Sequence, residues 1–111
     1  VKKINILKKN TDFTRIINNN KPYKSSNFII YIEKNTNDVY HFGLSVGKKI
    51  GKAVVRNKIK RQIKNIIDQK DYKNNFNCII IVKRGILNLS FFEMKQELMK
   101  QIAKLNIIKE K

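Results

Sequence analysis

Residues 53–68 combine an apolar face and a basic face at the spacing of an α-helix. At 100° per residue, five branched aliphatic side chains fall within an arc of about 120°. They are Val55, Ile59, Ile63, Ile66 and Ile67. The opposite side carries Asn57, Lys58, Lys60, Arg61 and Lys64, and Arg56 lies on the flank. The apolar face must pack on another layer, so the sequence predicts a helix that covers a sheet and leaves a basic ridge in solvent.

The positive charge around this segment is not balanced by acidic residues. Between Asp38 and Asp68 the chain has no acidic residue, although it is rich in lysine and arginine there. Over the whole chain, 25 basic and 8 acidic residues leave a formal charge of +17. A solvated helix face explains most runs of charge, but a face that serves only solubility mixes both signs. One-sign clustering favours a polyanionic partner, and nucleic acid is the first hypothesis.

Two further helices are expected near the ends of the chain. The first starts at Thr11, capped by Thr11 or Asn10, and stops in the asparagine run 18–20. The last helix follows Ser90, which is its expected N-cap. Its predicted apolar face consists of Phe92, Met94, Leu98, Ile102 and Leu105.

Three segments have the composition of β-strands. Residues 27–33 and 39–46 alternate in polarity, and the short connection between them predicts a pair of antiparallel neighbours. The unbroken apolar run 77–83 suits a central strand that is covered on both faces. The order helix, strands, helix, strand, helix indicates an α+β class, and 111 residues suit a single domain over residues 1–111.

Catalytic and membrane functions find little support in the residues. His41 is the only histidine, Cys78 lies alone in an apolar run that suits a reducing cytosol, and no pair of carboxylates suggests a metal site. The glycine–lysine stretch 43–54 lacks the spacing of a nucleotide-hydrolysing phosphate loop, although such a turn can offer N–H groups and ammonium groups to phosphates. A membrane-bound helix needs a free apolar face, whereas this one is expected to pack on a sheet. An acidic protein stays possible as a partner.

Two aromatic residues are candidates for contact with unpaired bases. Phe13 on the first predicted helix and Tyr31 on the first predicted strand could both line a surface groove. Core packing is the competing interpretation, and for Phe13 it is the more ordinary one. Tyr31 shares a strand face with Glu33, which indicates a partly wet surface. Stacking on aromatic rings is typical of proteins that bind single-stranded RNA.

The run SVGKKIGKAVVRNKIKRQIK (45–64) resembles the signature segment of the bacterial ribonuclease P protein subunit. The core of that signature is matched by Arg56, Asn57, Lys60 and Arg61. Lys58 stands where the family usually has arginine, and Gly47 replaces a common serine. Residues 7–13, 27–33 and 79–85 extend the resemblance over nearly the whole chain, in the order of the family. Ile17 occupies a position that is often aromatic in the family.

The resemblance implies a helix–strands–helix–strand–helix two-layer sandwich. Its sheet would be mostly antiparallel with about four strands and a left-handed βαβ crossover, like the second domain of ribosomal protein S5. The implied role is that of the protein subunit of ribonuclease P, an endoribonuclease that removes the 5′ leader from precursor tRNA. In such assemblies an RNA subunit performs the Mg²⁺-assisted hydrolysis. No catalytic residue or metal ligand is therefore expected in this chain.

The family also implies roles for individual residues and a cytoplasmic location. The catalytic RNA would be bound by Arg56, Asn57, Lys58, Lys60, Arg61 and Lys64, with Lys48, Lys49 and Lys52 extending the patch. The leader of precursor tRNA would be contacted by Phe13, Ile17 and Tyr31, helped by Lys83 and Arg84. Neither DNA nor a membrane is expected as a partner. The rival hypothesis is a structural ribosomal protein or an RNA chaperone, which would have the same basic ridge without a leader groove.

Overall fold

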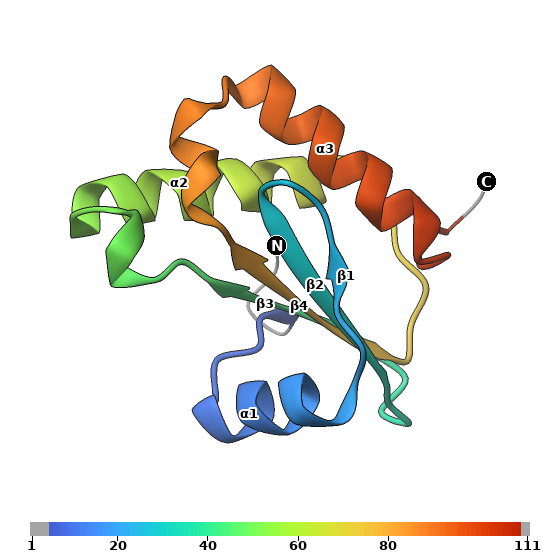
Figure 1. Cartoon of the computed structure of the whole chain (residues 1–111). Coiled ribbons are helices and arrows are strands. Elements are labelled where there is room, and N and C mark those ends of the chain that lie inside the picture. Colours follow the sequence, from blue (N-terminus) through green and yellow to red (C-terminus); the bar gives the residue numbers. More distant parts are fainter. Residues whose placement is uncertain (1–4, 110–111) are drawn as a thin grey trace.

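The protein is built around one four-stranded sheet with helices on both faces, as seen in the computed structural model, which describes residues 5–109 (Figure 1). The elements are α1 (Asn10–Asn19), β1 (Tyr23–Lys24), β2 (Phe28–Lys34), β3 (Tyr40–Ser45), η2 (Lys48–Ile50), α2 (Ala53–Ile67), β4 (Phe76–Val82), η3 (Arg84–Asn88) and α3 (Phe91–Lys104). The elements η2 and η3 are short 3₁₀ helices. This arrangement confirms the predicted α+β class.

The strand order in the sheet is β1-β2-β4-β3. The β1–β2 and β2–β4 pairs are antiparallel, whereas β3 runs parallel to β4. The predicted antiparallel pairing of 27–33 with 39–46 is therefore wrong, because β4 lies between these two strands. The first five residues of β4, Phe76 to Ile80, are all buried. The most apolar strand therefore buries the most apolar surface by taking the central position. The predicted βαβ crossover is the β3–α2–β4 unit.

The loop between β2 and β3 shows how the chain makes room for β4. The N–H of Asn35 donates to the carbonyl of Asn75 at 3.0 Å, and the N–H of Asn75 donates to the carbonyl of Val39 at 3.0 Å. The two ends of the loop thus bond to the residue that leads into β4. A loop that looks short enough for a hairpin instead spans the width of a third strand.

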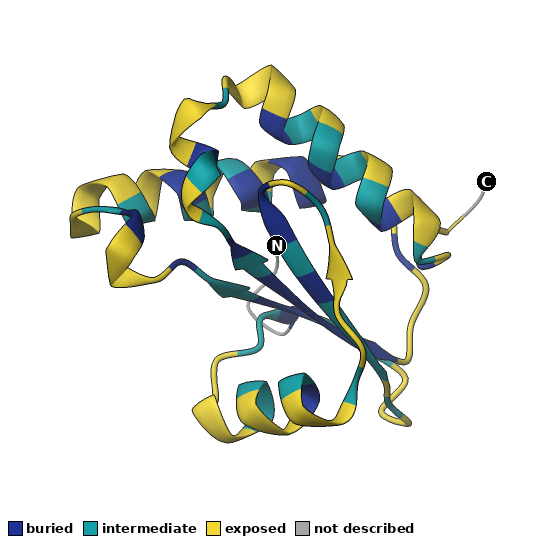
Figure 2. Ribbon diagram, viewed as in Figure 1, coloured by how far each residue is buried: buried dark blue, intermediate teal, exposed yellow. Residues whose placement is uncertain are grey.

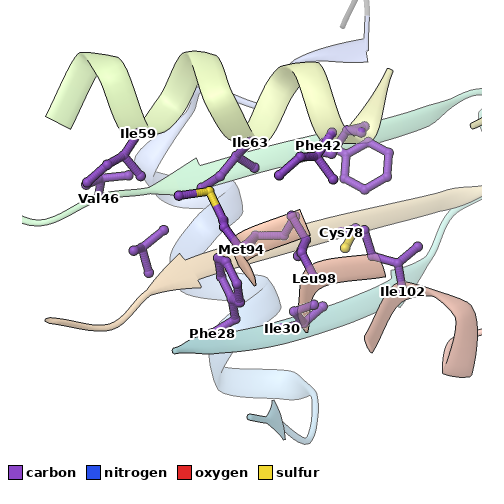
Figure 3. Close-up of a cluster of buried hydrophobic side chains, with 14 of the residues drawn as sticks. Phe28, Ile30, Phe42, Val46, Ile59, Ile63, Cys78, Met94, Leu98 and Ile102 are labelled. Atoms are coloured by element: carbon purple, nitrogen blue, oxygen red, sulfur yellow. The ribbon is translucent and has the colours of Figure 1, made fainter. Parts of the chain in front are cut away.

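The main core lies between the sheet and the helices α2 and α3 (Figure 3). Sheet residues such as Phe28, Ile30 and Cys78 meet the apolar faces of α2 and α3 there. This part of the molecule is the predicted two-layer sandwich. Helix α1 covers the opposite face of the sheet, where Ile16 and Ile79 are fully buried outside the main core cluster (Figure 1).

The helix ends agree with the sequence in part. The Ser90 side chain accepts a hydrogen bond from the N–H of Glu93 at 3.1 Å, and the Glu93 carboxylate accepts one from the N–H of Ser90, so the predicted cap is confirmed. The predicted cap of α1 is wrong, since Lys9 occupies that position without a side-chain hydrogen bond. Phe92 was expected on the apolar face of the last helix, but it is 63% exposed, because at 100° per residue it lies about 160° round α3 from the buried Met94.

A polar network fastens α3 to the turn between β1 and β2. The carboxylate of Glu97 accepts hydrogen bonds from the Ser25 hydroxyl, from the N–H of Asn27 at 2.8 Å and from the Asn27 side-chain amide at 2.6 Å. Burial raises the pKa of Glu97. The hydrogen bonds from Ser25 and Asn27 together lower it by more than burial raises it, so the pKa lies below its ordinary value. The ionised carboxylate is thus the form that stabilises the fold.

Glu97→Gln should lower the free energy of unfolding by about 1 to 2 kcal/mol at neutral pH, since hydrogen bonds to a charged group are lost. A carboxyl whose pKa is lowered by folding stabilises the protein above its unfolded pKa and loses this effect as pH falls through the folded pKa. The gap between wild type and variant should therefore shrink as the pH is lowered from about 5 to 3. Urea denaturation over this range measures the gap, and a constant gap would contradict the role of the ionised carboxylate.

Candidate nucleic-acid interface

The basic ridge predicted from the sequence lies on the solvent side of α2. Asn57, Lys58 and Arg61 are exposed, and Arg56, Lys60 and Lys64 are half-buried. The opposite side of the helix is anchored in the core, since Ile59, Ile63, Ile66 and Ile67 are at most 5% exposed. The remaining predicted apolar residue, Val55, is 36% exposed near the N-terminal end of α2, where Figure 2 also shows mainly exposed residues.

Lys48, Lys49 and Lys52 extend the ridge at the N-terminal end of α2. Lys48 and Lys49 belong to η2, Lys52 is the N-cap of α2, and all three side chains are exposed. Within residues 5–109, the ion pairs that we find join Arg15 to Asp12 and Glu33, and none involves a ridge residue. The positive charge of the ridge is therefore available to an external anion.

Helix geometry divides the ridge into two rows. Arg56, Lys60 and Lys64 follow one another at intervals of four residues, so they lie above one another on one side of α2. Asn57 and Arg61 form a second row further round the helix, and Lys58 lies beyond it. The first row adjoins a groove, because Lys60 and Lys64 belong to the lining of that groove.

This groove has a volume of about 610 Å³ and lies between α1, β3 and α2. Its apolar lining includes Phe13 and Ile17 of α1 and Leu44 of β3. Three lysines contribute to the lining: Lys8, Lys60 and Lys64. An apolar surface with ammonium groups at its margin suits a chain that carries both flat bases and phosphates. Lys8 was not among the predicted site residues, although it lies within the similar segment 7–13.

An ion-pair network fixes α1 against the sheet beside this groove. Arg15 donates to both carboxylate oxygens of Glu33 on β2, at 3.2 and 3.0 Å, and to Asp12 at 2.7 Å. The hydrogen bonds from Arg15 lower the pKa of Glu33, although burial opposes them, and the Asn77 amide donates to the same carboxylate at 2.9 Å. Exposed ion pairs contribute little stability each, so the network mainly sets the position of α1.

The predicted leader-binding residues do not all lie in this groove. Phe13 and Ile17 line it. Tyr31 lies on β2, two strands away from the β3 edge, because it pairs with Ile79 of β4 and Ile79 pairs with Gly43 of β3. The ammonium group of Lys83 donates to the carbonyl of Ser25 at 3.4 Å. Arg84 is exposed at the start of η3. The groove therefore brings together two residues predicted to bind the leader and two predicted to bind the RNA subunit. They are Phe13 and Ile17, and Lys60 and Lys64.

The two other potentially reactive side chains, His41 and Cys78, make contacts within the fold. Nδ1 of His41 lies 2.7 Å from the Asn77 side-chain oxygen, which also accepts from Asn35, so His41 is the donor in this contact. Cys78 is fully buried, and burial raises the pKa of its thiol. Over the described part of the chain, no three His, Cys, Asp or Glu side chains gather as metal ligands. None of the helices there is long and apolar enough to span a membrane.

Comparison with known proteins connects these features to one family. The family model described as ribonuclease P matches residues 1–106. The ribonuclease P protein component of Mycoplasma mobile is 41% identical over 107 residues, which cover 96% of this chain and 94% of that protein. The corresponding protein of Dictyoglomus turgidum is 44% identical over 108 residues, covering 93% and 90% of the two chains.

Solved structures agree with the sequence comparison. The Staphylococcus aureus RNase P protein superposes with a TM-score of 0.83 at 27% identity, covering 95% of this chain and 98% of that one. The RNase P protein from Thermotoga maritima gives a TM-score of 0.75 at 25% identity, covering 85% and 91%. The family match, the sequence identities and the common fold show that the chain belongs to the ribonuclease P protein family.

Proposed function

We propose that this chain is the protein subunit of a ribonuclease P holoenzyme and assists removal of the 5′ leader from precursor tRNA. The observation that carries the proposal is the basic ridge, whose cations are anchored on one helix and unpaired with the acidic residues of the described chain. A large folded RNA supplies the counter-charge that the ridge lacks. Family membership favours this role over a structural ribosomal protein or an RNA chaperone.

The second row of the ridge is the proposed contact with the catalytic RNA. Asn57 and Arg61 lie on the same side of α2, and Lys58 beside them is exposed. Arginine can bind phosphate in a bidentate manner, whereas Lys58 provides a point charge where the family usually has arginine. Lys48, Lys49 and Lys52 extend this contact toward η2.

The groove is the proposed path of the single-stranded leader. Phe13 offers a ring for base stacking, Ile17 adds apolar contact, and the row Arg56, Lys60 and Lys64 places positive charge at the border. Tyr31 would extend the contact across the sheet. Lys83 and Arg84, which follow β4, would reach leader nucleotides beyond it.

The hydrolysis itself is assigned to the RNA subunit. Mg²⁺ would be held by the RNA and the substrate, and its chemistry there would be to lower the pKa of a bound water and to offset negative charge on the phosphate. The protein would act by binding both RNAs and by reducing their mutual repulsion. Such a holoenzyme would work in the cytoplasm, where precursor tRNA is made.

Reconstitution tests this proposal directly. The purified chain is mixed with the ribonuclease P RNA of the same genome, and cleavage of precursor tRNA is followed at low Mg²⁺ concentration. We expect cleavage to require both components under these conditions. A rate that does not change when the chain is added would contradict the proposal, as would cleavage by the chain alone.

Arg61→Ala should weaken binding to the RNA subunit and reduce the slope of log affinity against log salt concentration by about 0.7 to 0.9 units. This is the contribution of one released phosphate counterion. Titrations at several salt concentrations measure the slope. Lys100→Ala, which removes one exposed positive charge from α3, is the matched control and should leave the slope unchanged. Equal slopes for wild type and Arg61→Ala would show that Arg61 contacts no phosphate.

Tyr31→Ala should weaken holoenzyme binding of precursor tRNA by about 5- to 150-fold, the cost of one lost base–aromatic stack. Binding of mature tRNA, which lacks the leader, should not change. Tyr23→Ala is the control, since Tyr23 is 52% exposed on β1 at the far edge of the sheet. Equal losses on both tRNAs would make Tyr31 a packing residue.

A further inference from the structure

Phe13 rests directly on the backbone of Gly43. Gly43 lies in the middle of β3 and pairs with Ile79 of β4. A Cβ atom added to Gly43 would lie 2.6 Å from Cζ of Phe13, 3.0 Å from Cε1 and 3.3 Å from Cε2. The tip of the phenyl ring therefore occupies the space that any other residue at position 43 would need for its side chain.

The backbone conformation gives no other reason for glycine at this position. Gly43 does not have the positive φ that favours glycine, and its neighbours on both sides continue the strand. Glycine in the middle of a strand is unfavourable relative to residues with a side chain, because more conformational freedom is lost on folding. What position 43 provides is space for the ring.

The ring has one direction in which it can yield. Helix α1 is anchored on the sheet by Ile16, which is fully buried, and the Arg15–Glu33 ion pair sets its position. A small shift of the Phe13 ring is therefore easier than a shift of the whole helix. The side of Phe13 that is not buried faces the groove. A side chain at position 43 would therefore push the phenyl ring into the groove, where the leader is proposed to lie.

We propose that Gly43 is a positioning residue for leader binding: it lets Phe13 sit low enough for an unpaired base to stack beside it. The proposal rests on the proposed function of the groove. It makes the depth of the groove depend on a residue that contributes no atom beyond its backbone.

Gly43→Ala tests the proposal in the reconstituted holoenzyme. We expect affinity for precursor tRNA to fall about 5-fold or more, near the lower limit for losing one stacked base. Affinities for mature tRNA and for the RNA subunit should stay the same. Gly47→Ala is the matched control, because a Cβ there would meet nothing within 4 Å. No loss with Gly43→Ala, or an equal loss with Gly47→Ala, would overturn the proposal.

A double-mutant cycle separates this effect from a general weakening of β3. In a Phe13→Ala background the space at Gly43 is already empty, so Gly43→Ala should cost nothing further in affinity for precursor tRNA. An equal cost in both backgrounds would overturn the proposal. If Gly43→Ala unfolds the chain, the stability of the double variant decides: recovery of folding supports the contact, and no recovery overturns it.

The phenyl ring itself provides a readout that does not depend on RNA. In NMR spectra with ¹³C-labelled phenylalanine, Gly43→Ala should shift the Phe13 ring resonances and Gly47→Ala should leave them unchanged. If Phe13→Ala alone does not change the affinity for precursor tRNA, the proposal that the groove binds the leader is wrong. If the Phe13 resonances do not shift in Gly43→Ala, the proposed contact between Phe13 and Gly43 is wrong. The two failures are therefore distinguishable.

Discussion

The packing of the isoleucine face of α2 on the sheet is the interaction on which the rest of this structure depends. Burial of an isoleucine side chain contributes about 1.5 to 3 kcal/mol, and Ile59, Ile63, Ile66 and Ile67 are all buried. Repulsion between like charges on a helix costs a few tenths of a kcal/mol per pair. The apolar face therefore determines how the helix lies, and the cations on the other side stay together in solvent.

Helices on both faces of the sheet create a second functional feature beside the ridge. Because α1 and α2 lie on different sides of the sheet, they approach each other only around its β3 edge, and the groove forms there (Figure 1). One row of α2 cations then borders the groove and the other faces solvent. Under the proposed function, this arrangement would let one helix contact two RNA molecules, the catalytic subunit and the substrate leader.

The elements of the fold were predictable from the sequence, but their neighbours in the sheet were not all predictable. The range of α2, the Ser90 cap and the central apolar strand follow from local periodicity and hydrogen-bonding preferences. The β2–β3 hairpin failed as a prediction because loop length alone does not say which strand lies next to which. Burial of β4 outweighed the local preference for a hairpin, a competition between distant segments that no local pattern records.

The site residues divide in the same way. The basic ridge could be predicted because all its members lie on one helix, where spacing alone places them on a common face. The full lining of the groove could not be predicted, since Phe13, Leu44 and Lys60 come from three separate segments. The sequence by itself determined the charge, the amphipathic helix and the family. Only the tertiary structure decided which cations meet the groove and that the Phe13 ring fills the space beside Gly43, because these facts depend on contacts between segments far apart in the chain.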